Sequence, residues 1–136
     1  LRPDVPFSER IRVMQLKNVL IVDDSKTMRL LISFALAKYW GCEIREASNG
    51  VEALAMLADA SPDLMVVDIN MPEMNGLELI RTVRQDPFKR NLPIIVITTE
   101  GSDEDIRKGM QAGATEYLVK PFQPQRLQAI IDRLDD

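Results

Sequence analysis

The chain has 136 residues, of which 46% are hydrophobic and 28% charged, and its net charge at pH 7 is -4. This length suits one folded domain, and the acidic balance argues against direct binding of nucleic acid. No apolar run reaches the roughly 20 residues that a membrane helix needs, so a cytoplasmic protein without membrane insertion is expected. Because the chain contains no histidine, serine–histidine and cysteine–histidine nucleophile pairs and imidazole metal ligands are excluded.

The first residues show no regular period. The segment "LRPDVPFSERIRVMQLKN" contains two prolines and mixed charges, and it predicts an N-terminal extension, a linker or a cloning remnant over residues 1–16. The folded domain is expected over residues 17–136.

From Val19 onward, short apolar runs alternate with apolar residues at helical spacing. Ser25 and Ser102 are predicted to cap helices, and Gly113 to end one. Strands are predicted over residues 19–24, 42–47, 64–68, 92–99 and 116–121, and helices over 26–40, 50–60, 76–85, 102–113 and 123–134. Strands that read as unbroken apolar runs are typical of a sheet covered on both faces. The predicted fold class is therefore α/β, a doubly wound parallel sheet of five strands with five helices.

Polar residues stand at the ends of four predicted strands. The first strand ends on Asp23 and Asp24, the third on Asp68, the fourth reaches Thr98, and the fifth reaches Lys120. Parallel strands bring their carboxyl ends to one edge of the sheet, where ligands bind. Three acids in one crevice need a cation or a shared proton, and oxygen ligands without nitrogen or sulfur favour Mg²⁺.

A magnesium ion held by carboxylates suits phosphate chemistry, and Lys120 and the Thr98 hydroxyl could then contact phosphate oxygens. No Gly-rich phosphate loop of the G-x-x-x-x-G-K-[ST] type occurs, so nucleotide binding is not expected. Since a carboxylate can itself attack phosphorus, Asp68 is the candidate nucleophile.

At these residues the sequence resembles the receiver domain of two-component response regulators. The resemblance covers about Lys17 to Leu134 and rests on "VDDS", "VVDINMPEMNGLELI", "ITTE" and "YLVKPF", and within that family it is closest in pattern to the single-domain chemotaxis regulators. It implies a flavodoxin-like sheet with strand order 2-1-3-4-5. It also implies a phosphorylation-activated signalling switch rather than an enzyme, with Mg²⁺ as its cofactor.

The resemblance assigns roles to the acids and to Lys120. Asp68 would accept a phosphoryl group from a phosphohistidine on a histidine kinase or a histidine phosphotransfer protein. Asp24, Asp68 and the backbone carbonyl of Asn70 would bind Mg²⁺, with Asp23 acting through a bound water. Lys120 would pair with the phosphoryl oxygens, and its peptide bond to the following proline would be cis.

The resemblance further implies a conformational switch. Thr98 would move toward the phosphoryl group and Tyr117 would swing inward, which would change a face built from the fourth helix, the fifth strand and the fifth helix. A downstream protein, whose identity the sequence does not reveal, would bind this face. Asn70 and Glu100 would set the rate of self-dephosphorylation. The candidate residues of the face are Thr99, Arg107, Lys108, Gln111, Glu116 and Tyr117.

Other interpretations stay open at this point. The chain could act alone, or it could be the receiver part of a larger response regulator or hybrid kinase. A haloacid-dehalogenase-type phosphatase also uses an aspartyl nucleophile, but it needs a second aspartate where this chain has Asn70. A receiver-like domain that binds partners without phosphate is disfavoured by the intact acids, Thr98 and Lys120. Trp40, at the end of the first predicted helix, is expected to be a packing anchor.

Overall fold

The computed structural model describes residues 16–134. The extension predicted for residues 1–16 lies outside the described residues except for Leu16, which packs against the core. The elements in chain order are β1 (Asn18–Val22), α2 (Lys26–Leu36), β2 (Glu43–Ala47), α3 (Gly50–Asp59), β3 (Leu64–Val67), α4 (Gly76–Arg84), the 3-10 turn η1 (Pro87–Lys89), β4 (Ile94–Thr98), α5 (Asp103–Ala112), β5 (Glu116–Val119) and α6 (Pro124–Leu134).

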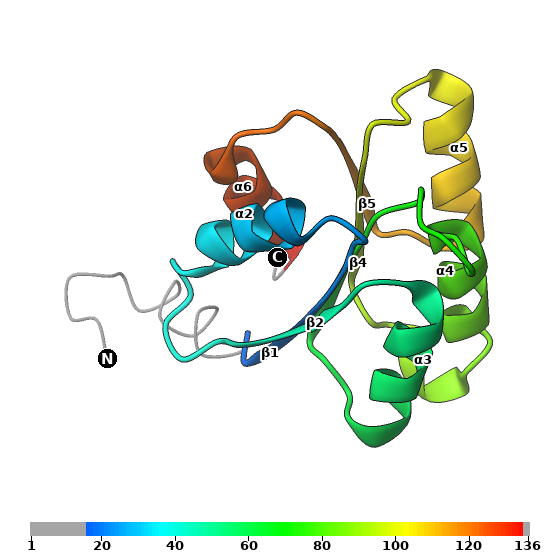
Figure 1. Ribbon diagram of the computed structural model, residues 1–136, viewed down its shortest axis with the longest axis horizontal. Coiled ribbons are helices and arrows are strands. Elements are labelled where there is room, and N and C mark those ends of the chain that lie inside the picture. The colour runs from blue at the N-terminus through cyan, green and yellow to red at the C-terminus, as the bar shows by residue number, and fades with distance from the viewer. Residues whose placement is uncertain (1–15, 135–136) are drawn as a thin grey trace.

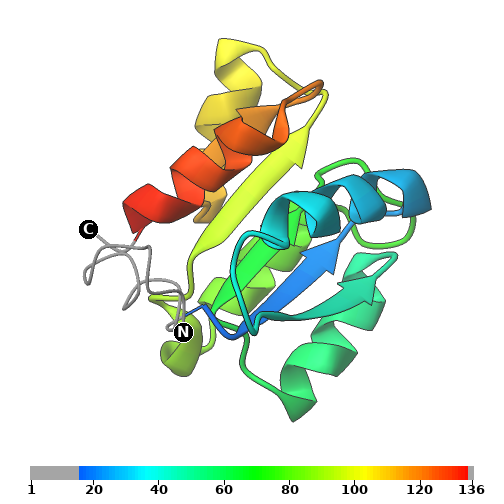
Figure 2. The same ribbon diagram turned by 90° about the vertical axis from the view of Figure 1, so that its left-hand side faces the viewer.

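The five strands form one sheet in the order β2-β1-β3-β4-β5, and every neighbouring pair is parallel. The predicted fold class and strand order are therefore confirmed. In Figures 1 and 2, α2 and α6 lie on one side of the sheet and α3, α4 and α5 on the other. This three-layer arrangement explains why the central strands read as continuous apolar runs, since both of their faces are buried.

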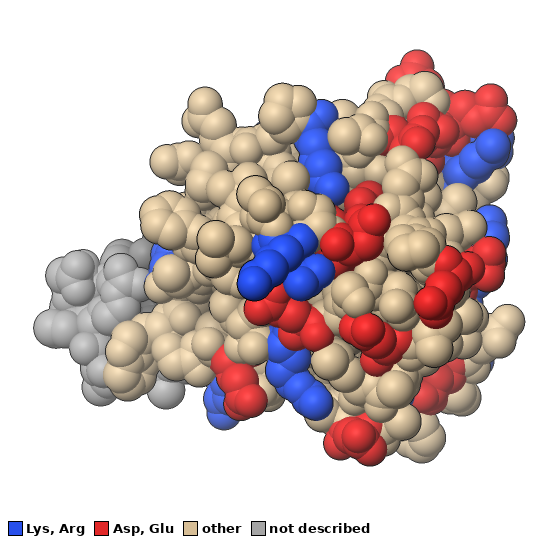
Figure 3. Space-filling view, viewed as in Figure 1, with Lys and Arg blue, Asp and Glu red and all other residues tan. Residues whose placement is uncertain are grey.

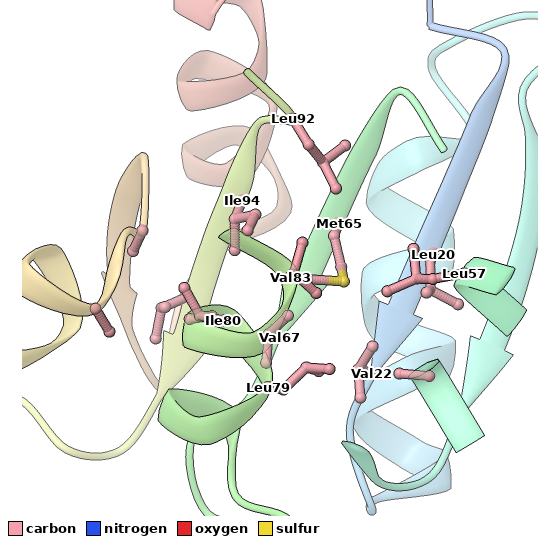
Figure 4. Close-up of a cluster of buried hydrophobic side chains, with 14 of the residues drawn as sticks. Leu20, Val22, Leu57, Met65, Val67, Leu79, Ile80, Val83, Leu92 and Ile94 are labelled. Carbon is pink, nitrogen blue, oxygen red and sulfur yellow. The ribbon is translucent and has the colours of Figure 1, made fainter. Parts of the chain in front are cut away.

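Alternate residues of each strand supply the two cores. Leu20 and Val22 of β1 face α3 and α4, whereas Val19 and Ile21 face α2 and α6. Figure 4 shows the first core, in which side chains from β1 and β3 meet those of α4, such as Leu79. Burial of this apolar surface is the main force that keeps the sheet and its helices together.

The predicted caps are present. Ser25 accepts a hydrogen bond from the backbone N–H of Met28 at the start of α2. Ser102 forms a reciprocal capping box with Asp105 at the start of α5. Gly113 ends α5 with a φ of 121°, a backbone conformation that glycine adopts without steric cost.

Two expectations for the segment after Ser25 are wrong. The helix ends at Leu36 instead of reaching residue 40, because the N–H of Ala37 bonds to Phe34 and tightens the last turn. Trp40 is 66% exposed and therefore anchors no packing. The buried aromatic here is Tyr39, whose hydroxyl donates to Asp132 on α6 at 2.9 Å. The 3-10 turn η1 was not predicted either, although Asp86 before Pro87 is a typical start for one.

Candidate functional site

Three carboxylates meet at the carboxyl edge of the central strands. Asp23 follows β1 and Asp68 follows β3, and these strands are neighbours in the sheet. Asp23, Asp24 and Asp68 can each offer one oxygen within 4.8 Å of the others. Asp23 and Asp68 are 1% and 6% exposed, whereas Asp24 lies open to solvent. The predicted convergence of the three acids is therefore present in the structure.

Lys120 joins two of these acids. Its Nζ lies 3.1 Å from Asp23 Oδ2 and 3.3 Å from Asp68 Oδ2. The residue follows β5 and is held there by a backbone hydrogen bond from its N–H to the carbonyl of Thr98, and its bond to Pro121 is cis as expected. One ammonium thus partly offsets the repulsion of two buried carboxylates.

Asp23 is the acid most affected by burial. Removal from water raises the pKa of its carboxyl group, while the N–H of Ser25 and the Lys120 ammonium act in the opposite direction. The Ser25 N–H donates to Asp23 Oδ1 at 2.8 Å, so one oxygen is engaged by the backbone and the other by Lys120.

Arg29 on α2 supports this acid from outside, and the sequence did not single it out. It donates to the backbone carbonyl of Asp23 at 2.7 Å and pairs with Glu46 of β2 at 2.8 Å. The only sequence signal is its place one turn after the Ser25 cap, which many exposed helical arginines share.

A second group of predicted residues borders Asp68 on the side of β4. Thr98 is fully buried, and the N–H of Glu100 lies 3.4 Å from its hydroxyl oxygen. The side-chain amide of Asn70 donates to the Glu100 carboxylate at 2.7 Å, and the Asn70 N–H donates to Asp68 Oδ1 at 3.2 Å. Asn70 and Glu100, proposed separately from the sequence, are therefore joined beside Asp68.

Tyr117 of β5 is tied to the same loop. Its hydroxyl donates to the backbone carbonyl of Glu100, and its ring lies so close to α5 that a Cβ at Gly109 would be 2.7 Å from Cε2. Burial and the nearby charges of Asp105 and Glu100 raise the pKa of Tyr117 to about 12. The hydroxyl therefore stays protonated and able to donate at physiological pH.

Gly76 allows the loop after Asp68 to close tightly. A Cβ at this position would lie 2.3 Å from the Asp68 carbonyl oxygen and 2.8 Å from Cα of Ile69. The helix α4 can thus begin directly behind the Asp68 backbone. This close packing limits the backbone conformations of Asp68 and so the direction of the Asp68 side chain.

Acidic side chains predominate on one half of the face shown in Figure 3. Figure 3 shows acidic side chains spread over the half of the visible face that α3, α4 and α5 form, with a few basic side chains between them.

Over residues 16–134, no helix has the length and apolar character needed to cross a membrane.

Together, the flavodoxin-like sheet and the cluster of carboxylates with one lysine at its carboxyl edge define a phosphate-responsive signalling module. The sequence profile of the response regulator receiver domain matches residues 19–132, and the chain belongs to this family. Receiver domains are phosphorylation-activated signalling modules of two-component systems, and they bind Mg²⁺ at an acidic pocket of the kind described above.

Several similar relatives are chemotaxis proteins. The chain is 45% identical over 111 residues to the chemotaxis protein CheY1 of Helicobacter pylori, which covers 81% of this chain and 90% of that protein. It is 41% identical over 119 residues to a CheY homolog of Campylobacter jejuni, covering 87% and 89%. The solved structure of CheY4 of Vibrio cholerae has a TM-score of 0.80 and 39% identity, covering 88% of this chain and 98% of that one. The phosphatase alternative gains no support from these relatives.

Proposed function

We propose that Asp68 is the phosphoacceptor of this receiver domain and that a phosphohistidine on a histidine kinase or phosphotransfer protein is its donor. An Asp68 carboxylate oxygen forms a bond to phosphorus while the phosphorus–nitrogen bond breaks, and its electron pair returns to the imidazole of the donor. The observation that carries the proposal is the Lys120 ammonium 3.3 Å from Asp68 Oδ2. A cation so placed can stabilise the charge on the equatorial oxygens of the transition state.

The residues around Asp68 fit a magnesium ion. Asp24, Asp68 and the backbone carbonyl of Asn70 would hold it, with Asp23 acting through a bound water, and these groups supply the hard oxygen atoms that Mg²⁺ prefers. The three carboxylates lie close enough together to share one ion. When bound, the ion would neutralise and align phosphoryl oxygens. The exposure of Asp24 leaves a path by which such an ion can enter the crevice.

Thr98 and Lys120 then detect the phosphoryl group. The Thr98 hydroxyl, whose oxygen accepts from the Glu100 N–H, donates its proton to a phosphoryl oxygen, and Lys120 exchanges part of its pairing with Asp23 for the new charge. These contacts differ between the two states of Asp68, which is the condition for a shift in conformational population.

Tyr117 passes the change to the surface. Its hydroxyl bond to Glu100 links the loop after β4 to the face formed by α5, β5 and α6, and this face binds the downstream protein. Because the chain is similar to chemotaxis proteins over most of its length, we place this output in a chemotaxis-like two-component system. The residues of the face are Thr99, Arg107, Lys108, Gln111, Glu116 and Tyr117.

Asn70 and Glu100 control how long the phosphoryl group persists. Their mutual hydrogen bond lies beside Asp68, where a water must approach to hydrolyse the acyl phosphate. A pair that is held together hinders this approach more than two independent side chains would.

The test is phosphorylation of the full chain by acetyl phosphate with Mg²⁺, followed by the intact mass in acid. Wild type should gain one phosphoryl group and Asp68→Asn none, because the amide is close in shape but is not a nucleophile. Asp59→Asn, which changes an exposed acid at the end of α3, is the matched control and should behave as wild type. Phosphorylation of Asp68→Asn at the wild-type rate would refute the assignment.

A further inference from the structure

A pocket lies at the edge of the sheet opposite to the acids. It has a volume of about 350 Å³ and is formed by the first residues of β1 and β2, the last turn of α3 and the loop that follows. Leu20 and Leu57, both buried, and Met56 make its apolar lining, while Glu43 and Arg45 stand at its rim. The volume falls within the range of sites that accept small ligands or a large side chain.

A large apolar side chain projects from the same edge. Phe88, in the turn η1 before β4, is 96% exposed. Its backbone is nevertheless fixed, since its N–H donates to Asp86 Oδ1 at 2.9 Å and Lys89 pairs with Asp86 at 2.7 Å. Arg84 of α4 adds a hydrogen bond to the Lys89 carbonyl at 2.9 Å. An exposed aromatic ring on a fixed turn loses little conformational entropy when it is buried in a partner.

We propose that the chain forms a weak, symmetric dimer in which Phe88 of each copy inserts into the pocket of the other. The projection and the pocket both lie at the amino-terminal ends of the strands. They are also on the same side of the sheet, since the turn η1 contacts α4 and the pocket is lined by α3. Under two-fold symmetry both copies use the same surface, so the contact between ring and pocket is made twice and no further copy can be added there.

The charges beside the two features allow one ion pair across this contact. Arg45 and Glu43 both stand at the pocket rim, so the match depends on the acid alone: Arg90 follows the turn that carries Phe88, and the side chains of Arg90 and Glu43 are both exposed. Within residues 16–134, neither of them takes part in an ion pair. In the dimer, Arg90 of one copy pairs with Glu43 of the other, at the solvated rim of the contact.

The dimer leaves the phosphorylation site open. The three acids and Lys120 lie at the carboxyl edge of the sheet, so both crevices remain accessible to a donor. The contact is also small: two inserted rings and their rims bury less than the roughly 1,200 Å² of a stable interface. Association is therefore expected in the high micromolar range, roughly 0.1 to 1 mM.

The experiment is sedimentation equilibrium of the full chain from about 20 µM to 1 mM, concentrations chosen to span that range. The average mass of wild type should rise steadily with concentration toward that of a dimer without exceeding it. Phe88→Ala should weaken association by about tenfold or more, as truncation of a central aromatic anchor does. Phe34→Ala is the control, since this ring is 71% exposed on α2, on the other side of the sheet.

A charge exchange tests the pairing of the two features directly. Arg90→Glu should weaken the dimer, and Glu43→Arg in the same chain should restore it. A wild-type chain that stays monomeric at the highest concentration, an unchanged association of Phe88→Ala, or a mass that grows beyond the dimer would each overturn the proposal. Phosphorylation of Phe88→Ala by acetyl phosphate should equal that of wild type, so failure here is distinct from failure of the proposed function.

Discussion

At the level of single residues, the crevice contains more negative than positive charges. Three carboxylates face one ammonium, and two of the carboxylates are almost fully buried. Asp23 bears the largest consequence, since burial raises its pKa despite the Ser25 N–H and Lys120. Without a divalent ion, the ionised form of this residue therefore destabilises the fold at neutral pH.

The first prediction follows for Asp23. A raised pKa means that the folded state disfavours the charge more than the unfolded state does, so Asp23→Asn should increase the free energy of unfolding at pH 7. The gain should shrink as the pH falls below the raised pKa, because wild type is then neutral at this position as well. Urea titrations in EDTA at pH 7 and at lower pH measure both effects. Destabilisation by Asp23→Asn at pH 7 would contradict the argument.

A second prediction concerns Cys42. Desolvation, with a smaller effect from the charge of Asp63, raises the pKa of this half-buried thiol to about 11. Only the thiolate attacks a disulfide reagent, so at pH 8 the folded protein should react roughly a hundredfold more slowly than a thiol with a pKa near 9. The rate should keep rising up to about pH 11. The control is the urea-unfolded chain, whose rate should level off near pH 9; an equal rate in the folded chain would refute the shift.

How far the sequence predicts this site depends on how each residue is positioned. Asp23, Asp68 and Lys120 each follow a strand, so the parallel topology alone brings them together. The bond between Asn70 and Glu100 joins two loops whose side chains could point elsewhere, and no spacing in the sequence determines it. Arg29 was missed because no spacing in the sequence indicates that its side chain turns toward the Asp23 backbone.

At the level of elements, α5 and β5 are coupled through one close contact. Gly109 lies in the helix at the place where the Tyr117 ring packs, and no side chain would fit between them. The same ring is fixed at its other end by the bond to the Glu100 carbonyl. The observed position of the Tyr117 ring therefore depends on a residue of α5 that has no side chain.

The third prediction tests this contact with a double-mutant cycle. Alanine is a better helix former than glycine by about 1 kcal/mol, so Gly109→Ala should stabilise a Tyr117→Ala chain by about that amount. In the wild-type background the new Cβ meets the ring, and the same change should give no gain or a loss. Urea unfolding of the four proteins gives the coupling energy, which we expect to be about 1–2 kcal/mol. Additive effects would mean that the ring moves aside freely.

The ends of elements were the least predictable feature of the fold. The apolar spacing of the first helix continues to residue 40, yet the helix ends at Leu36. After the tightened last turn, Tyr39 lies against α6, and its hydroxyl donates to Asp132 and the Gln128 carbonyl. These partners lie about ninety positions further along the chain, so local propensity contains no information about them.

At the level of the whole molecule, folding brings together carboxylates that repel one another. The parallel sheet can bury its central strands only by bringing their carboxyl ends together, and three of the residues placed there are acids. A bound cation would lessen this conflict for the entire fold, since a single domain of this size is expected to unfold as one cooperative unit.

The fourth prediction is that Mg²⁺ stabilises the folded chain. A ligand that binds only the folded state adds about 1.4 kcal/mol for each tenfold increase of its concentration above the dissociation constant. The urea midpoint of wild type should therefore rise as Mg²⁺ is added and return when EDTA removes it. Asp24→Asn should flatten this dependence, because it removes the exposed carboxylate of the three, whereas Asp59→Asn should keep it. If Asp24→Asn responds to Mg²⁺ as wild type does, the three acids do not act as one cation site, since the ion then binds without the carboxylate that solvent reaches most easily.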